Sequence, residues 1–145
     1  MIVVVDANAI VIALADPIGG RGRDVRQRLV QLDDGENETY VLPHTKLEVT
    51  QSLRKAVLAG VVPEPDAIDA IRSMNSWPFR TFPLGRPQLE RVWELRNNLS
   101  AYDAAYVTAV EQLGARKRRT DAVLVTADKK LTRAPGLSIN IEVID

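Results

Sequence analysis

The chain begins with four consecutive branched aliphatic residues, Ile2 to Val5, and this run ends at a carboxylate, Asp6. An aliphatic run without polar alternation predicts a strand that is buried on both faces. Such strands belong to parallel sheets that helices cover on both sides. Ligands of open parallel sheets bind beyond the carboxyl ends of the strands. Asp6 is therefore expected at the edge of the sheet where ligands bind.

The rest of the chain alternates between short apolar strands and helices. Further strands are predicted at residues 40–42, 77–84, 123–126 and 139–143. Helices are predicted at residues 9–15, 25–32, 43–59, 66–75, 87–95, 100–114 and 128–131, with Asn8 as the N-cap of the first. Strands separated by helices predict an α/β fold, a three-layer α/β/α sandwich with a mainly parallel central sheet. Prolines in the segment 77–84 suit an edge strand, because proline donates no ladder hydrogen bond.

The composition limits the kinds of site that the chain can form. Its 145 residues are 46% hydrophobic, which predicts one domain over residues 1–145. The absence of cysteine excludes disulfides, thiolate metal sites and a cysteine nucleophile, and is compatible with a cytoplasmic location. The single histidine, His44, cannot form a zinc site alone. Any metal would be held by oxygen atoms, which favours Mg²⁺ or Mn²⁺.

The apolar start of the chain does not have the pattern of a signal sequence. It lacks a basic region and is interrupted by Asp6 and Asn8. No apolar run approaches the roughly 20 residues of a membrane-spanning helix. No membrane association is expected.

Two aspartates follow apolar strands in the same way. Asp6 follows residues 2–5, and Asp128 follows residues 123–126. A helix-capping role would explain either acid alone, because aspartate is a favoured N-cap. If the two strands are neighbours, however, the two carboxylates converge on one crevice. Asp121 precedes its strand, so it is expected at the opposite edge of the sheet in a structural or solvent-facing role.

Two further acids are expected near the same edge. Asp103 follows Ser100 in a Ser-x-x-Asp capping box, which would also explain it without catalysis. Glu48 lies about one turn after the strand at 40–42. Two carboxylates about 4 Å apart repel by roughly 4 kcal/mol at an effective dielectric constant of 20, so a cluster of them requires protons or a cation. Asn8 and Thr126 are candidates for orienting water or substrate beside such a cluster.

These residues together resemble the PIN-domain ribonucleases, and within them the VapC-like toxins of type II toxin–antitoxin pairs. The resemblance covers nearly the whole chain and rests on residues 3–8 (VVVDAN), Glu48, residues 99–107 (LSAYDAAYV) and residues 124–131 (LVTADKKL). It implies a PIN-like sandwich and an endoribonuclease that depends on Mg²⁺ or Mn²⁺. It also implies a homodimer and a cognate VapB-like antitoxin.

The resemblance assigns the site residue by residue. It implies a catalytic cluster of Asp6, Glu48, Asp103 and Asp128, in which Asp6 and Asp103 bind the metal directly and Asp128 binds it through water. The chain departs from many relatives in a longer basic loop between Gly114 and Val123. The role of this loop, residues 116–121, is left open.

The charge distribution suits an RNA substrate. Lysine and arginine (19) balance aspartate and glutamate (19), but without the four site acids 15 acidic residues stand against 19 basic ones. The remaining surface is thus net positive, as phosphate binding requires. The candidate phosphate-binding cations are Arg21, Arg23, Arg116, Lys117, Arg118, Arg119, Lys129 and Lys130. Each of them could equally be a solvated surface charge.

Other functions fit the sequence less well. An aspartyl-phosphate phosphatase would require an acid two residues after Asp6, where Asn8 stands. A receiver domain would require paired acids after the first strand and a phosphoacceptor aspartate after a central one, and neither is evident. The main alternative keeps the fold but makes the chain a non-catalytic RNA-binding or scaffold protein.

Overall fold

The computed structural model of the chain describes residues 1–17, 19–32, 35–116 and 121–144. Within these residues, five strands form one sheet in the order β3-β2-β1-β4-β5. The strands are β1 (Ile2–Val5), β2 (Glu38–Val41), β3 (Arg80–Thr81), β4 (Ala122–Thr126) and β5 (Asn140–Val143). Every neighbouring pair is parallel. The predicted α/β sandwich with a parallel sheet is confirmed.

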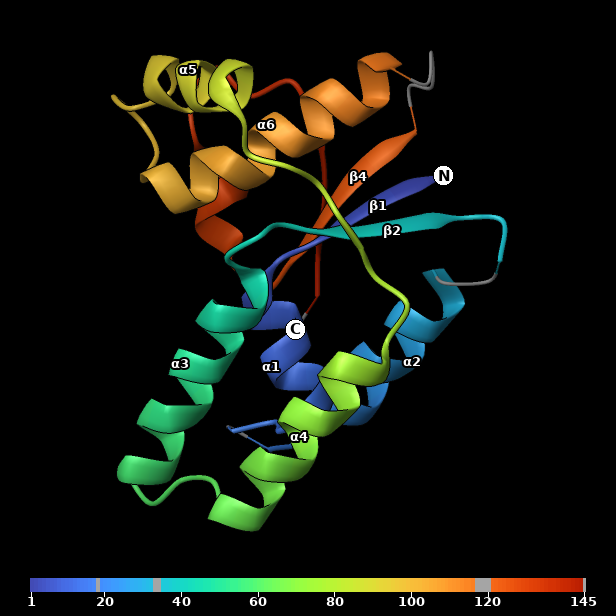
Figure 1. Cartoon of the computed structure of the whole chain (residues 1–145), viewed down its shortest axis with the longest axis vertical. Helices are drawn as coiled ribbons and strands as arrows, with labels where there is room; N and C mark the ends of the chain where they lie inside the picture. Colours follow the sequence, from blue (N-terminus) through green and yellow to red (C-terminus); the bar gives the residue numbers. More distant parts are fainter. Residues whose placement is uncertain (18, 33–34, 117–120, 145) are drawn as a thin grey trace.

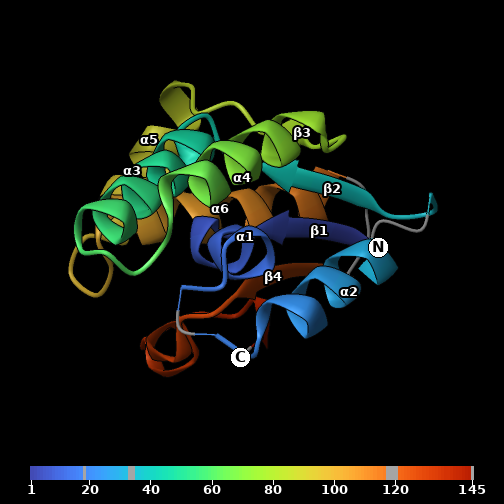
Figure 2. The same cartoon turned by 90° about the horizontal axis from the view of Figure 1, so that it is seen from below.

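Helices cover both faces of the sheet (Figures 1 and 2). The helices are α1 (Ala7–Leu14), α2 (Gly22–Leu32), α3 (Thr45–Leu58), α4 (Glu64–Ser76), α5 (Arg86–Glu94) and α6 (Ala101–Arg116), with a short 3₁₀ helix η1 (Lys129–Arg133). In Figure 1, α5 and α6 lie above the strands and α1 to α4 lie below them. No helix among the described residues is long and apolar enough to cross a membrane.

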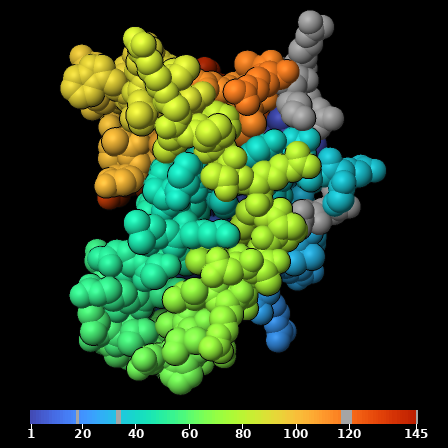
Figure 3. Space-filling view, in the orientation of Figure 1, coloured from blue at the N-terminus to red at the C-terminus, as the bar shows by residue number. Residues whose placement is uncertain are grey.

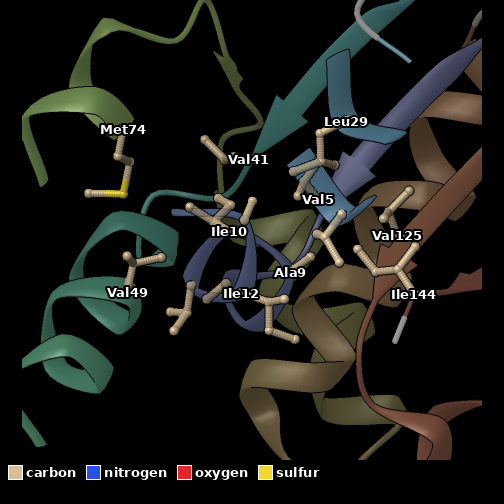
Figure 4. Close-up of a cluster of buried hydrophobic side chains, with 14 of the residues drawn as sticks. Val5, Ala9, Ile10, Ile12, Leu29, Val41, Val49, Met74, Val125 and Ile144 are labelled. Carbon is tan, nitrogen blue, oxygen red and sulfur yellow. The ribbon is translucent and has the colours of Figure 1, made fainter. Parts of the chain in front are cut away.

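The strand β1 lies at the centre of the sheet. A hydrophobic core packs against each face of the sheet, and β1 contributes side chains to both of these cores. Val3 and Val5 pack against α1 to α4, while Ile2 and Val4 pack against α5 and α6. All four side chains are fully buried. This is why the strand contains no polar residue, since neither of its faces meets water. Figure 4 shows the first of these cores, where Val5, Ile10, Val49 and Met74 converge from four elements.

The predicted edge strand at 77–84 is confirmed as an edge but is much shorter than expected. Only Arg80 and Thr81 pair with β2. Apolar and polar residues alternate in this segment, but strand pairing is not the main cause of this pattern. Trp77 and Phe79 pack into the core beneath the sheet, whereas Phe82 packs into the core above it. The segment thus passes over the edge of the sheet on its way from α4 to α5 (Figure 1).

Candidate active site

The first two acids of the candidate site stand at the carboxyl ends of adjacent strands. β1 pairs with β4 along its whole length, from Ile2 opposite Ala122 to Val5 opposite Val125. The backbone N–H of Asp6 continues this pairing by donating to the carbonyl oxygen of Val125 at 2.9 Å. The expectation that the strands before Asp6 and Asp128 are neighbours is therefore confirmed.

Asp6 is a buried carboxylate at the carboxyl end of β1. Only 6% of its surface is exposed, and the Thr126 hydroxyl donates to Asp6 Oδ2 at 2.8 Å. Asp6 occupies the N-cap position of α1, but its side chain makes no capping hydrogen bond. Burial raises the pKa of Asp6 to about 6. The hydrogen bond from Thr126 and the backbone of Ala7 oppose this rise. The charges of Glu48 and Asp103 add to it. The backbone of Ala7 thus lowers the pKa of Asp6, but without a capping hydrogen bond of normal geometry, helix capping does not account for the burial of this acid.

Asn8 and Thr126 brace the turn that carries Asp128. Asn8 was expected to cap the first helix, but the helix begins at Ala7, so Asn8 lies inside its first turn. Its Oδ1 instead accepts a hydrogen bond from the backbone N–H of Ala127 at 2.9 Å. The Thr126 hydroxyl oxygen accepts from the N–H of Asp128 at 3.0 Å. Both side chains thus join the end of β4 to the start of α1, and a contact of either with substrate stays a prediction.

Asp103 and Asp128 line one cavity, Asp103 at the start of α6 and Asp128 at the start of η1. Asp103 lies in the first turn of α6, and its N–H donates to the Ser100 hydroxyl at 3.2 Å, which is one of the two hydrogen bonds of the predicted capping box. Burial raises the pKa of Asp103, the charge of Asp128 raises it further, and a hydrogen bond with Ser100 opposes both. Asp128 does act as a cap, because its Oδ1 accepts from the N–H of Lys130 at 2.9 Å at the start of η1.

Glu48 is held by side chains that the sequence analysis did not single out. The Tyr106 hydroxyl donates to Glu48 Oε1 at 3.0 Å and is 2.8 Å from the Thr45 hydroxyl. Thr45 in turn accepts from the N–H of Leu42 at 2.9 Å, at the end of β2. The Nε2 atom of His44 lies 3.3 Å from Glu48 Oε1. This chain of contacts connects the strand end to the carboxylate.

A signal for these partners was present in the sequence. Thr45 and Glu48 are three residues apart on α3, and Asp103 and Tyr106 are three apart on α6, a spacing that puts each pair on one side of its helix. A buried tyrosine also requires a partner for its hydroxyl. What the spacing does not reveal is that the two helix faces meet.

The arrangement of the acids is open rather than tightly clustered. The charges of Glu48 and Asp103 both act on Asp6, and that of Asp128 acts on Asp103, so the four acids are electrostatically connected. Among the described residues, however, no group of three or more histidine or acidic side chains is arranged to hold a metal ion directly. The oxygen donors still suit Mg²⁺, which keeps several waters and commonly uses one or two carboxylates.

The other charged candidates are distributed around the molecule. Asp121 lies at the amino end of β4, where it is 3.5 Å from the N-terminal amine, which confirms its expected place at the opposite edge. Lys130 lines a cavity that also contains Asp103 and Asp128. Arg116 ends α6, far along the helix from Asp103. Lys117, Arg118 and Arg119 lie outside the described residues.

Comparison with curated proteins finds relatives that match almost the entire chain. Ribonuclease VapC1 of Mycobacterium tuberculosis is 32% identical over 142 residues, which cover 97% of this chain and 96% of the relative. Ribonuclease VapC12 of the same organism is 30% identical over 144 residues, with 98% of each chain covered. No family model matches the chain.

Solved structures with the same fold come from two other bacteria. The chain is similar to one in the crystal structure of VapBC2 from Rickettsia felis bound to a promoter DNA fragment, with a TM-score of 0.67, 16% identity and 100% of both chains covered. It is also similar to a chain in the structure of FitAcB from Neisseria gonorrhoeae, with a TM-score of 0.63, 15% identity and coverage of 96% of this chain and 95% of that one.

Proposed function

Because this chain belongs to the family of VapC ribonucleases, we propose that it is a metal-dependent endoribonuclease and the toxin of a toxin–antitoxin pair. The reaction is hydrolysis of an RNA phosphodiester bond at the carboxyl ends of β1 and β4. The catalytic residues are Asp6, Glu48, Asp103 and Asp128.

The burial of Asp6 is the observation that carries this proposal. An aspartate whose pKa is raised to about 6 by burial is costly to ionise, and nearby carboxylates increase that cost. The cap that could explain a structural aspartate is missing. A cation beside Asp6 would offset the free-energy cost of ionising it. Metal binding would therefore explain why a carboxylate is buried close to other carboxylates.

The donor set suits Mg²⁺ or Mn²⁺. Asp6 and Asp103 would hold the ion directly and Asp128 through water, an arrangement that agrees with the open spacing of the acids. A bound ion would supply charge neutralisation at the phosphate and lower the pKa of an attacking water.

The protein's own residues would position the remaining groups. The Tyr106 hydroxyl fixes Glu48 through its Oε1, so the carboxylate is oriented before substrate binds. Burial raises the pKa of Tyr106, so its hydroxyl stays protonated and remains a hydrogen-bond donor. Glu48 would then accept a proton from the attacking water, as a general base does. Thr126 keeps Asp6 in place during the reaction.

The proposed partners follow from the relatives and the surface. The structural neighbours are complexes named VapBC2 and FitAcB, which supports a VapB-like antitoxin as partner. Large exposed apolar side chains support a homodimer, since they favour contact surfaces over water. Among these side chains are Leu47 on α3, Leu89 and Trp93 on α5, and Tyr102 on α6.

Cleavage of RNA by the purified chain tests the function. Wild-type protein is expected to cut RNA internally with Mg²⁺ or Mn²⁺ and to lose this activity with a chelator. Asp6→Asn should abolish cleavage, whereas Asp121→Asn, which changes an acid at the opposite edge of the sheet, should not. Equal cleavage by wild type and Asp6→Asn would refute the site. Binding of RNA without any cleavage would favour the non-catalytic alternative.

A further inference from the structure

A cavity of about 330 Å³ opens directly beside two of the site acids. It lies between the start of α6 and the helix η1 and is lined by both Asp103 and Asp128. Its polar lining residues are Asn98, Ser100, Asp103, Asp128, Lys130 and Arg133. Its volume is near the lower end of the roughly 300–1,000 Å³ that small-ligand sites occupy, which suits one nucleotide unit rather than a long stretch of chain.

Two of the residues that line this cavity, Lys130 and Arg133, are cations. Lys130 and Arg133 are exposed, and in the part of the chain that the structure describes neither side chain forms an ion pair. They share the cavity with Asp103 and Asp128, yet they do not pair with them. The cations therefore remain available for an anion that enters from outside, and the acids remain available for a cation.

Acids and exposed cations in one cavity suit a nucleic acid strand that crosses the site. A phosphodiester at the acids has its next phosphate about one nucleotide away, and a cation at that position can bind it. Arg133 adds a planar donor group that suits phosphate oxygens, and Lys130 adds a point charge. Asn98 and the Ser100 hydroxyl offer polar contacts for a sugar or base edge.

Another cavity of the molecule lacks this chemistry. The cavity between α2 and the segment after α4 is lined by Val3, Val5, Leu29, Phe79 and other apolar side chains, and contains no charged residue. It therefore offers no counter-charge to a phosphate.

We propose that the cavity between α6 and η1 binds the ribonucleotide next to the scissile bond, with Lys130 and Arg133 holding its phosphate. This assignment rests on the proposed ribonuclease function. Lys130 was one of several cations expected to contact RNA, whereas Arg133 had no sequence signal of its own. The other expected cations do not line this cavity.

Binding can be measured separately from cleavage in an Asp6→Asn background. The ligand is a short fluorescently labelled RNA in buffer with Mg²⁺, and the readout is the Kd as a function of salt concentration. The added change Lys130→Gln with Arg133→Gln should weaken binding by about tenfold or more and lower the salt dependence by roughly one phosphate contact per lysine or arginine removed. The matched control is Arg54→Gln with Lys55→Gln, which removes two exposed cations from α3.

The outcomes separate this proposal from the ribonuclease function. Equal effects of the two double changes on Kd, an unchanged salt dependence, or no RNA binding at all would overturn the cavity assignment. In otherwise wild-type protein, the cavity variant should raise KM with little change in kcat, because Lys130 and Arg133 act in binding. If wild-type protein cleaves no RNA, the ribonuclease function fails, while the binding measurement still decides the role of the cavity.

Discussion

The carboxylate of Asp6 is buried where its ionisation costs free energy. A rise in pKa from 3.8 to about 6 is equivalent to roughly 3 kcal/mol between the two protonation states. Because the folded state binds this proton more tightly than the unfolded state, Asp6 contributes most stability below about pH 4. That contribution is lost as the pH rises through about 6. At neutral pH the metal-free protein therefore carries an unfavourable charge.

Asp6→Asn should consequently stabilise the metal-free protein while it abolishes catalysis. The amide oxygen can still accept from Thr126, so the expected gain in free energy of unfolding at pH 7.5 is about 1–3 kcal/mol. The gain should vanish near pH 4. Thermal unfolding with a chelator at both pH values measures this, and Asp69→Asn on the exposed surface of α4 is the control. A lower Tm for Asp6→Asn at pH 7.5 would contradict the argument.

The hydroxyl of Tyr106 can be removed without removing its ring. Tyr106→Phe removes the hydroxyl donor to Glu48 and leaves the 3.3 Å contact of Glu48 with His44, and hydrogen bonds to charged groups are worth about 1.5–3 kcal/mol. We expect kcat to fall by about tenfold or more with a smaller change in KM.

Thr108→Val is the matched control for Tyr106→Phe. It also removes a buried hydroxyl from α6, but this hydroxyl donates to the carbonyl of Ala104 and is not hydrogen-bonded to a site acid. If both variants lower kcat equally and in proportion to lost stability, Tyr106 has only a structural role.

The two ends of β4 each lie next to an aspartate, and only the carboxyl end is expected to act in catalysis. Asp121 precedes the strand and Asp128 follows it, so a parallel sheet sends them to opposite edges. Asp128→Asn should lower the rate of RNA cleavage at least about tenfold, whereas Asp121→Asn should stay within about twofold of wild type. Initial rates on one RNA substrate compare the two directly. The reverse order would show that the last site acid lies elsewhere.

The connection between α4 and α5 shows where a local pattern misleads. Its alternation of large apolar and polar residues has the period of a strand, but only two of its residues pair in the sheet. Trp77 is half-buried on one face of the sheet and Phe82 is buried on the other, because the chain crosses the sheet edge between them. A segment that crosses from one face of a sheet to the other can therefore show the same alternation of apolar and polar residues as a strand.

The surface of the whole molecule carries apolar side chains that suit a partner. Trp93 is 67% exposed and Leu89 is 54% exposed, both on α5. In Figure 3 the yellow and gold region that contains α5 forms the upper left of the surface, above the green α3–α4 half. The guanidinium carbon of Arg96 lies 4.6 Å from the centroid of the Trp93 ring. Most of the Trp93 side chain is nevertheless exposed.

Light scattering of the purified protein is expected to give twice the mass of one chain. Trp93→Glu should shift this mass toward that of a monomer, because a charge in an apolar contact is costly. Leu58→Glu, which changes an equally exposed residue at the end of α3, is the control. A wild-type protein that is monomeric at all concentrations would refute the proposed homodimer.

The sequence by itself determined the order of strands and helices and the edge of the sheet at which Asp6 and Asp128 lie. Both follow from local patterns, since burial of both strand faces and the direction of parallel strands leave their mark on consecutive residues. Only the tertiary structure decided how deeply Asp6 is buried, that Tyr106 reaches Glu48, and that Arg133 shares a cavity with Asp103. These contacts join residues that are far apart in the chain. They depend on how helices pack across the sheet, which no local pattern records.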